Sequence, residues 1–399
     1  PSPPRLAEQQ DNDRLMPGLL LPLDELDPTE SALPGSPPLI ESEESAAAAA
    51  FPAEPETLVP APPAPPRARA TNYTAAACWT TMLVFGDSTV DPGNNNRLQT
   101  AAKANFPPYG MSFYGGKPTG RFSNGRLITD ILAEKLGIAT SIPGFLDLML
   151  KPGQLRTAGV SFASAGSGYD DATAKRSNVL SFSNQIQDLR RYKRNLKTSA
   201  GPKKAEQLVR NATFVISAGT ADLLFHYLPS NHSARDSQQQ QYENQLIARV
   251  ANYTQAIRKL GGRRFIFVGL PPVGCLPIVR TLLGTGPDTC HGDMNLLAAS
   301  FNRRLAKLVR LLKNETDTRA TLIDVYTVVA TATADPSSFG LTETTRGCCG
   351  TGVIEVGQAC RGRKTSKYLY WDAVHQTERM NQIITDDAIA NSIKEISFA

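Results

Sequence analysis

Residues 81–88 read Thr-Met-Leu-Val-Phe-Gly-Asp-Ser, an apolar run that ends in a turn carrying a serine. Nearly continuous apolar character over such a length is typical of a strand buried on both faces of a sheet. The chain repeats the pattern four times more, and we expect each run to form a strand. The five runs are residues 81–85, 158–162, 212–216, 264–270 and 320–326.

Amphipathic helices are indicated between these runs, because apolar residues recur there every three or four positions. The first stripe stops at Gly261 and Gly262, as expected where glycine ends a helix. Strands alternating with helices predict an α/β fold, in which a five-stranded, mainly parallel sheet has helices on both faces. The two stripes are Leu246, Val250, Tyr253, Ile257 and Leu260, and then Leu296, Phe301, Leu305, Leu308 and Leu312.

The composition divides the chain into two parts. Residues 1–70 hold 16 of the 29 prolines and carry 12 acidic against 4 basic residues, a net charge of −8. The remaining 329 residues carry 38 basic and 25 acidic residues, a net charge of +13. The first part lacks the periodic apolar residues that offset the entropy of ordering. We therefore expect residues 1–75 to be a disordered, acidic, proline-rich arm and residues 80–399 to form one folded domain.

The sequence does not favour nucleic acid as a partner. Basic residues are scattered over the body, only 7% of the chain is aromatic, and no helix-turn-helix, RNA-recognition or zinc-finger spacing occurs. An anionic polymer or a membrane surface fits the net positive charge of the body better.

Neither a membrane span nor a metal or cofactor site is predicted. The longest apolar stretch, residues 265–279, is interrupted by Pro271, Pro272 and Pro277, whereas a span needs about 18 or more apolar residues. No Cys-x-x-Cys pair occurs and the four histidines are dispersed, unlike the ligands of a zinc site.

Three features predict a secreted protein. The sequence begins with proline rather than methionine, which a cleaved secretory signal would explain. Its six cysteines favour disulfides, and the candidate pairs are Cys275 with Cys290, and Cys348 or Cys349 with Cys360. Acceptor sites for N-glycosylation occur at Asn72, Asn211, Asn231, Asn252 and Asn314.

The residues that follow the strands are the first candidates for a functional site, because binding sites of parallel α/β sheets lie at the carboxyl ends of the strands. Ser88 follows the first run, on a turn that can expose its hydroxyl and leave its N–H near a helix N-terminus. Gly166 and Gly168 follow the second run, and residues 217–222 follow the third. The alternatives are a helix cap at Ser88 and plain tight turns at the glycines.

Residues 371–375, Trp-Asp-Ala-Val-His, supply a partner for that hydroxyl. An Asp three residues before a His on a turn places both side chains on one side. The carboxylate of Asp372 can then accept from one imidazole nitrogen of His375 and leave the other facing a nucleophile. The candidate triad is Ser88, Asp372 and His375. No Gly-x-Ser-x-Gly string, the elbow of many α/β-hydrolases, occurs in the chain.

Several strings resemble those of the plant-type GDSL esterase/lipase family, a branch of the SGNH hydrolases. The resemblance runs from about Met82 to the end of the chain, and its strings are specific. They are residues 85–96, which begin Phe-Gly-Asp-Ser, residues 109–110 and 118–126, residues 271–277, and residues 347–352.

The resemblance implies a three-layer α/β/α, flavodoxin-like SGNH hydrolase fold for residues 80–399 and the hydrolysis of carboxylic esters, often of lipids. It implies Ser88 as the nucleophile, His375 as the base and Asp372 as the partner of the base. The oxyanion hole of the family has three donors: the serine N–H, a glycine N–H that corresponds to Gly166 or Gly168, and an asparagine side chain. We expect a monomer secreted through the endoplasmic reticulum to the cell wall or apoplast, with a lipid, another acyl ester or an ester polymer as its substrate.

The chain departs from the family at the third oxyanion donor. The family has Gly-x-Asn-Asp where this chain has Gly219-Thr-Ala-Asp222, so Ala221 replaces the asparagine. Loss of one donor costs about 10²–10³ in rate, which predicts weakened acyl transfer. The alternatives are an acyltransferase of cutin-like or wax-like polymers and a catalytically silent relative that binds acyl groups. Gln376 also replaces the usual proline after the histidine, which predicts a looser turn.

Overall fold

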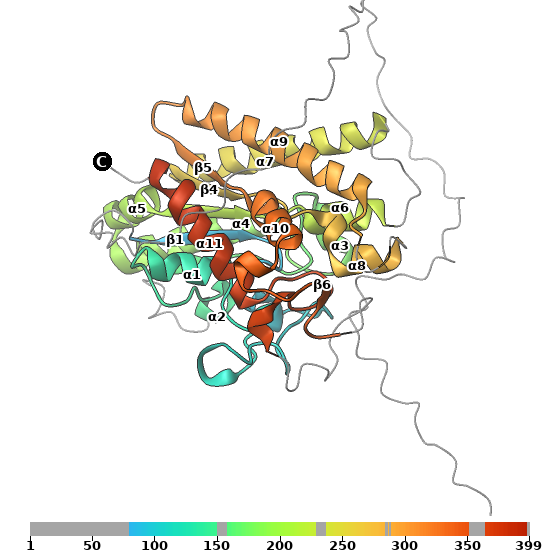
Figure 1. Ribbon diagram of the computed structural model, residues 1–399. Coiled ribbons are helices and arrows are strands. Elements are labelled where there is room, and N and C mark those ends of the chain that lie inside the picture. The colour runs from blue at the N-terminus through green and yellow to red at the C-terminus, as the bar shows by residue number, and fades with distance from the viewer. Residues whose placement is uncertain are drawn as a thin grey trace, which may run out of the picture. The chain divides into compact units, whose positions relative to one another are not determined.

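Five parallel strands form the central sheet of the computed structural model, which describes residues 80–149, 158–228, 237–283, 286, 289–350 and 364–396 (Figure 1). The strands lie in the order β2-β1-β3-β4-β5, so the predicted parallel α/β sheet is confirmed. The predicted arm, residues 1–75, lies outside the described residues. The strands are β1 (Met82–Gly86), β2 (Gly159–Ser161), β3 (Thr213–Ser217), β4 (Arg264–Val268) and β5 (Arg319–Ile323).

The register places all five strand ends at one edge. Leu83 of β1 pairs with Val160 of β2 on one side and with Phe214 of β3 on the other. Because the chain passes from β1 to β2 on one side and then to β3 on the other, the carboxyl end of β1 lies where the strand order reverses. Ligands of open α/β sheets bind at this kind of position.

Eleven α-helices are seen among the described residues. The helix α7 contacts both α4 and α9, with α4 also on β1 and α9 on β5, while α11 contacts both α1 and α10. Figure 1 shows the strands between these two groups of helices. The helices are α1 (Ile128–Lys135), α2 (Phe145–Met149), α3 (Asp171–Arg176), α4 (Phe182–Ala200), α5 (Pro202–Asn211), α6 (Thr220–Tyr227), α7 (Ser237–Leu260), α8 (Pro277–Leu282), α9 (Gly292–Lys313), α10 (Val325–Ala334) and α11 (Glu378–Asn391). Short 3₁₀ helices are η1 (Asn94–Arg97), η2 (Tyr114–Gly116), η4 (Val273–Cys275), η5 (Ser337–Phe339), η7 (Thr365–Lys367) and η8 (Ile393–Ile396).

Two details of the predicted elements were wrong. The last apolar run, residues 320–326, does not form a strand throughout. Its strand ends at Ile323, and the Asp324 carboxylate accepts from the Thr327 N–H at 3.0 Å, which caps α10. In α9 the predicted stripe is displaced at its start, because Leu296 is 50% exposed and Leu297 is buried. The other predicted stripe lies in α7, which ends at Leu260, just before Gly261.

A second, two-stranded parallel sheet was not predicted from the sequence. It pairs β6 (Glu343–Gly347) with β7 (Tyr368–Tyr370) and contacts α8, α10 and α11. Both strands are short, and the residues of β6 are mostly polar, so neither has the apolar run of the central strands. The turn with the candidate histidine follows β7 directly.

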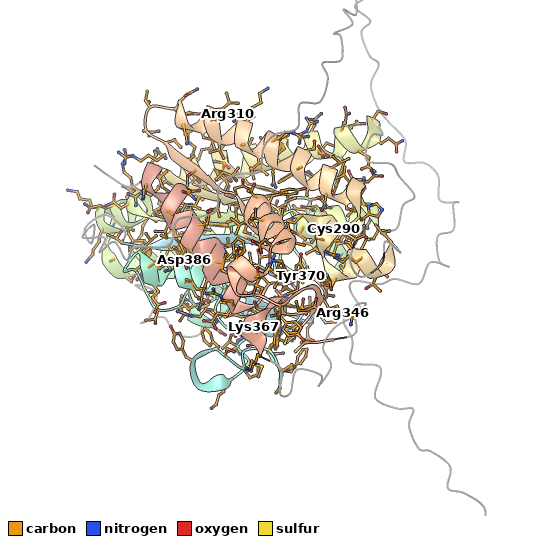
Figure 2. The ribbon with its side chains drawn as sticks, viewed as in Figure 1. Cys290, Arg310, Arg346, Lys367, Tyr370 and Asp386 are labelled. Atoms are coloured by element: carbon orange, nitrogen blue, oxygen red, sulfur yellow. A yellow bond between two sulfur atoms is a disulfide. The ribbon has the colours of Figure 1, made fainter. Side chains whose placement is uncertain are left out.

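The cysteines lie partly as expected. The predicted disulfide between Cys275 and Cys290 is present (Figure 2 labels Cys290). Cys349 is also disulfide-bonded, whereas Cys360 lies outside the described residues. Within the described ranges no helix is long and apolar enough to cross a membrane, and no three His, Cys, Asp or Glu side chains gather as metal ligands would.

Candidate active site

Ser88 lies just past the end of β1, where close packing fixes the turn. A Cβ atom on Gly86 would lie 1.8 Å from the carbonyl oxygen of Ser217 in β3, and Gly86 has a φ of +143°. Only glycine fits both conditions. The Gln185 side chain of α4 bonds the N–H of Gly86 at 2.8 Å and its carbonyl at 2.9 Å, and the Asp87 N–H donates to Ser217 at 3.0 Å. The turn that carries Ser88 is therefore held by β3 and α4.

The histidine turn is held by hydrogen bonds to its own aspartate. Oδ1 of Asp372 accepts from the N–H groups of Val374 at 2.9 Å and His375 at 2.7 Å. The Trp371 N–H donates to the carbonyl of His375 at 2.7 Å. The carbonyl of Gln376 accepts from Ser123 Oγ at 3.2 Å. The turn is thus bonded on both sides, although Gln376 replaces the proline usual in the family.

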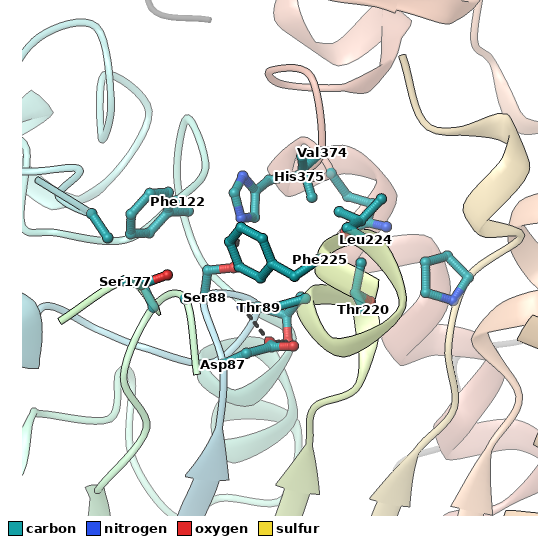
Figure 3. A pocket seen from close by; sticks show the side chains of 16 residues that line it. Asp87, Ser88, Thr89, Phe122, Ser177, Thr220, Leu224, Phe225, Val374 and His375 are labelled. Carbon is teal, nitrogen blue, oxygen red and sulfur yellow. Dashed lines mark hydrogen bonds between the residues drawn. The ribbon is translucent and has the colours of Figure 1, made fainter. Parts of the chain in front are cut away.

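The structure brings the three predicted side chains together. Nδ1 of His375 lies 2.8 Å from Oδ2 of Asp372. Nε2 of His375 lies 2.7 Å from Oγ of Ser88, which is 287 residues away in the sequence (Figure 3). An imidazole between a carboxylate and a hydroxyl can take the hydroxyl proton while the carboxylate stabilises the resulting charge.

Asp372 is surrounded by groups that favour its charged form. Burial alone raises the pKa of this carboxyl, but the facing His375 and the hydrogen bonds outweigh burial, so the net pKa lies below its ordinary value. The phenol of Tyr109 donates a further hydrogen bond to Oδ2 at 2.8 Å. This contact was not predicted from the sequence, although Tyr109 belongs to a string that resembles the family.

Packing fixes this phenol in turn. Tyr109 is 1% exposed, and its ring makes edge contacts with the rings of Phe122 and Trp371. Phe122 also packs on the imidazole of His375, with ring centroids 4.9 Å apart. A small aromatic cluster thus packs against Asp372 and His375.

A pocket opens over Ser88 and is lined largely by apolar side chains (Figure 3). The space over Ser88, with its open mouth to solvent included, is about 760 Å³. Its apolar wall includes Phe122, Leu224, Phe225 and Val374. Asp87, the residue before Ser88, also lines the pocket. Burial raises the pKa of the Asp87 carboxyl.

The structure distinguishes between Gly166 and Gly168, the two candidates for the second backbone donor. Gly166 lines the pocket, and its N–H, like that of Ser88, makes no hydrogen bond to any described residue. Gly168 is absent from the pocket wall, and a Cβ atom there would lie 2.1 Å from Oδ1 of Asp222. The geometry therefore favours Gly166 over Gly168 as the second backbone donor.

Ala221, which stands at the usual asparagine position, also lines the pocket. It is the second residue of α6, and the next residue, Asp222, is fully buried. The Asp222 carboxylate accepts from the Tyr169 N–H at 2.7 Å and from the hydroxyl of Thr173 at 2.6 Å. Burial outweighs these bonds and raises the pKa of Asp222 to about 6. Asp222 thus ties α6 to the loop after β2.

Comparison with known proteins agrees with the resemblance. A model of the GDSL-like Lipase/Acylhydrolase family matches residues 82–388. GDSL esterase/lipase At5g45950 of Arabidopsis thaliana is 42% identical over 79% of this chain and 88% of its own length, and At5g42170 of the same plant is 40% identical over 79% and 86%. Among solved structures, the lipase Lip_vut3 from a goat rumen metagenome is 12% identical with a TM-score of 0.36, over 78% of this chain and 96% of that one. On the family model and the plant relatives, this chain belongs to the GDSL-like lipase/acylhydrolase family.

Proposed function

We propose that this protein is a carboxylic ester hydrolase that acts on lipid or other acyl-ester substrates. The observation that carries the proposal is the 2.7 Å contact between Ser88 Oγ and His375 Nε2, with Asp372 on the other imidazole nitrogen. The names of its relatives as esterases or lipases support the same class of reaction.

In the proposed reaction, Ser88 Oγ attacks the acyl carbonyl carbon while His375 takes the hydroxyl proton. The carbonyl oxygen becomes an oxyanion, which the N–H groups of Ser88 and Gly166 stabilise. The bond to the alcohol then breaks, and His375 gives its proton to the leaving alkoxide. Water adds to the acyl-enzyme in the same way, releasing the carboxylic acid and restoring Ser88.

The pocket supports a substrate with an apolar acyl group, because its walls are mainly apolar apart from the groups near Ser88. We also propose that the protein acts outside the cell. The disulfide between Cys275 and Cys290 supports an oxidising compartment. Three of the predicted glycosylation sites, Asn211, Asn252 and Asn314, have exposed side chains; Asn72 and Asn231 lie outside the described residues.

A hydrolysis assay tests the proposal. Wild type, Ser88→Ala and the exposed control Ser338→Ala are compared with p-nitrophenyl acetate and butyrate. We expect Ser88→Ala to fall to the background rate and Ser338→Ala to match wild type. A fluorophosphonate should add covalently to Ser88, as peptide mass spectrometry would show. Equal background rates in all three proteins would leave a silent acyl-binding relative and end the hydrolase proposal.

A further inference from the structure

The Asp-Pro-Gly-Asn-Asn-Asn segment, residues 91–96, has no part in the reaction as described so far. It follows the nucleophile turn and leads into η1. Its side chains Asp91, Asn94 and Asn95 are each at most 1% exposed. All three form hydrogen bonds with the backbone of one other segment, residues 161–165, which immediately precedes Gly166.

Asn95 holds the carbonyl half of the peptide group that contains the Gly166 N–H. Its Nδ2 donates to the carbonyl oxygen of Ala165 at 2.8 Å. Its Oδ1 accepts from the hydroxyl of Ser164, and Nδ2 donates a second bond to Ala102 at 2.8 Å. The amide of Asn95 is thus anchored on three sides.

The geometry of the peptide bond links this contact to the pocket. The C=O and the N–H of a trans peptide lie in one plane and point in opposite directions. Since the Ala165 carbonyl points at Asn95, the N–H of Gly166 must point away from Asn95. Gly166 lines the pocket, and its N–H has no acceptor among the described residues. The direction of this donor therefore depends on Asn95.

Asp91 and Asn94 fix the residues just before this peptide. Oδ2 of Asp91 accepts from the Ala165 N–H at 3.0 Å. Nδ2 of Asn94 donates to the carbonyls of Ser161 at 2.9 Å and Ala163 at 2.8 Å. The chain leaving β2 is therefore held at Ser161, Ala163 and Ala165 by side chains that follow β1.

We propose that Asn95, assisted by Asp91, is a positioning residue that aims the Gly166 N–H at the oxyanion. The inference rests on the proposed ester hydrolysis and goes beyond it by giving the Asp-Pro-Gly-Asn-Asn-Asn segment a role. The donor acts on charge that develops only in the transition state. Loss of its aim should therefore lower kcat and leave KM nearly unchanged.

The test compares Asn95→Ala with Asn96→Ala, a neighbour of the same type. Asn96 is a matched control because its Nδ2 donates to the carbonyl of Thr119 at 2.8 Å and its side chain makes no hydrogen bond to residues 161–166. We expect Asn95→Ala to lower kcat about 10-fold to 100-fold, with KM within about twofold of wild type. Phenylboronic acid, which forms a tetrahedral adduct on the serine, should bind at least tenfold more weakly. We expect Asn96→Ala to keep kcat within about twofold of wild type.

Active-site titration with a fluorophosphonate separates positioning from folding, because kcat is then expressed per functional site. A merely structural role would lower the titrated fraction and leave kcat per site and boronate affinity unchanged, which would overturn the inference. Asp91→Ala, which removes the acceptor of the Ala165 N–H, should repeat the signature if Asn95→Ala does not fold. Unchanged kcat per site in Asp91→Ala would then overturn it.

The controls also separate this inference from the proposed function. If the wild type shows no Ser88-dependent turnover, both the proposed ester hydrolysis and the positioning role of Asn95 are overturned. If the wild type shows such turnover and Asn95→Ala leaves kcat per active site unchanged, only the positioning role is overturned.

Discussion

Adding the missing amide at position 221 tests the oxyanion hole most directly. Ala221 lines the pocket with Ser88 and Gly166, in the first turn of α6, where the helix dipole favours negative charge. A side-chain donor in a complete oxyanion hole is worth about 10²–10³ in kcat. The side chain of Ala221 is a methyl group and offers no donor, so we expect Ala221→Asn to raise kcat by about tenfold or more, which corresponds to roughly 1.4 kcal/mol.

The assay measures kcat and KM for p-nitrophenyl butyrate with wild type, Ala221→Asn and Ala221→Asp. KM should stay within about twofold of wild type, because the new donor acts on the transition state. Aspartate matches asparagine in size but brings a negative charge in place of the donor, so Ala221→Asp should lower kcat. If Ala221→Asn gives no gain, or both substitutions change kcat alike, α6 does not border the oxyanion and the reasoning is refuted.

Three further predictions concern stability, each measured by urea unfolding. Tyr109→Phe removes the phenol that bonds Asp372 and should lower the free energy of unfolding by about 1.5–3 kcal/mol; an equally stable variant would contradict that bond. The pKa of Asp222 is about 6 in the folded protein, above its ordinary value of 3.8, so its stabilising contribution is fully present below pH 3.8 and is lost as pH rises through 6. The stability of wild type relative to Asp222→Asn should therefore fall by roughly 1 kcal/mol between pH 5 and 7.5; a constant difference would disprove the shift. Replacing Cys275 and Cys290 by alanine opens a loop of sequence separation 15 and should cost about 3 kcal/mol; a loss below about 1 kcal/mol would count against this estimate.

The central sheet could be predicted because strands buried on both faces leave nearly continuous apolar runs. The same reasoning failed where that signal is missing. The strand β6 is mostly polar and β7 has only three residues. Neither has the long apolar run from which the central strands were predicted. The overlong prediction at residues 320–326 has a related cause: apolar Val325 and Tyr326 begin α10, and Asp324 marks the boundary only through its capping bond.

The candidate site was predictable in its residue types but not in its geometry. Ser88 and His375 occur in strings with a clear chemical meaning. The choice between Gly166 and Gly168 depends on backbone direction, which no composition or spacing reveals. The bond of Tyr109 to Asp372 joins residues 263 positions apart, and such a contact follows from the fold alone.

The parts of the candidate site occur at opposite ends of the folded region. Ser88 follows the first strand, whereas Asp372 and His375 follow the last, so the hydroxyl leaves the ribosome long before its imidazole partner has been made. An incomplete chain carries an inactive serine whatever its state of folding. A site with this chain order can be assembled only when synthesis is nearly finished, because an early-terminated product lacks both the imidazole of His375 and the carboxylate of Asp372.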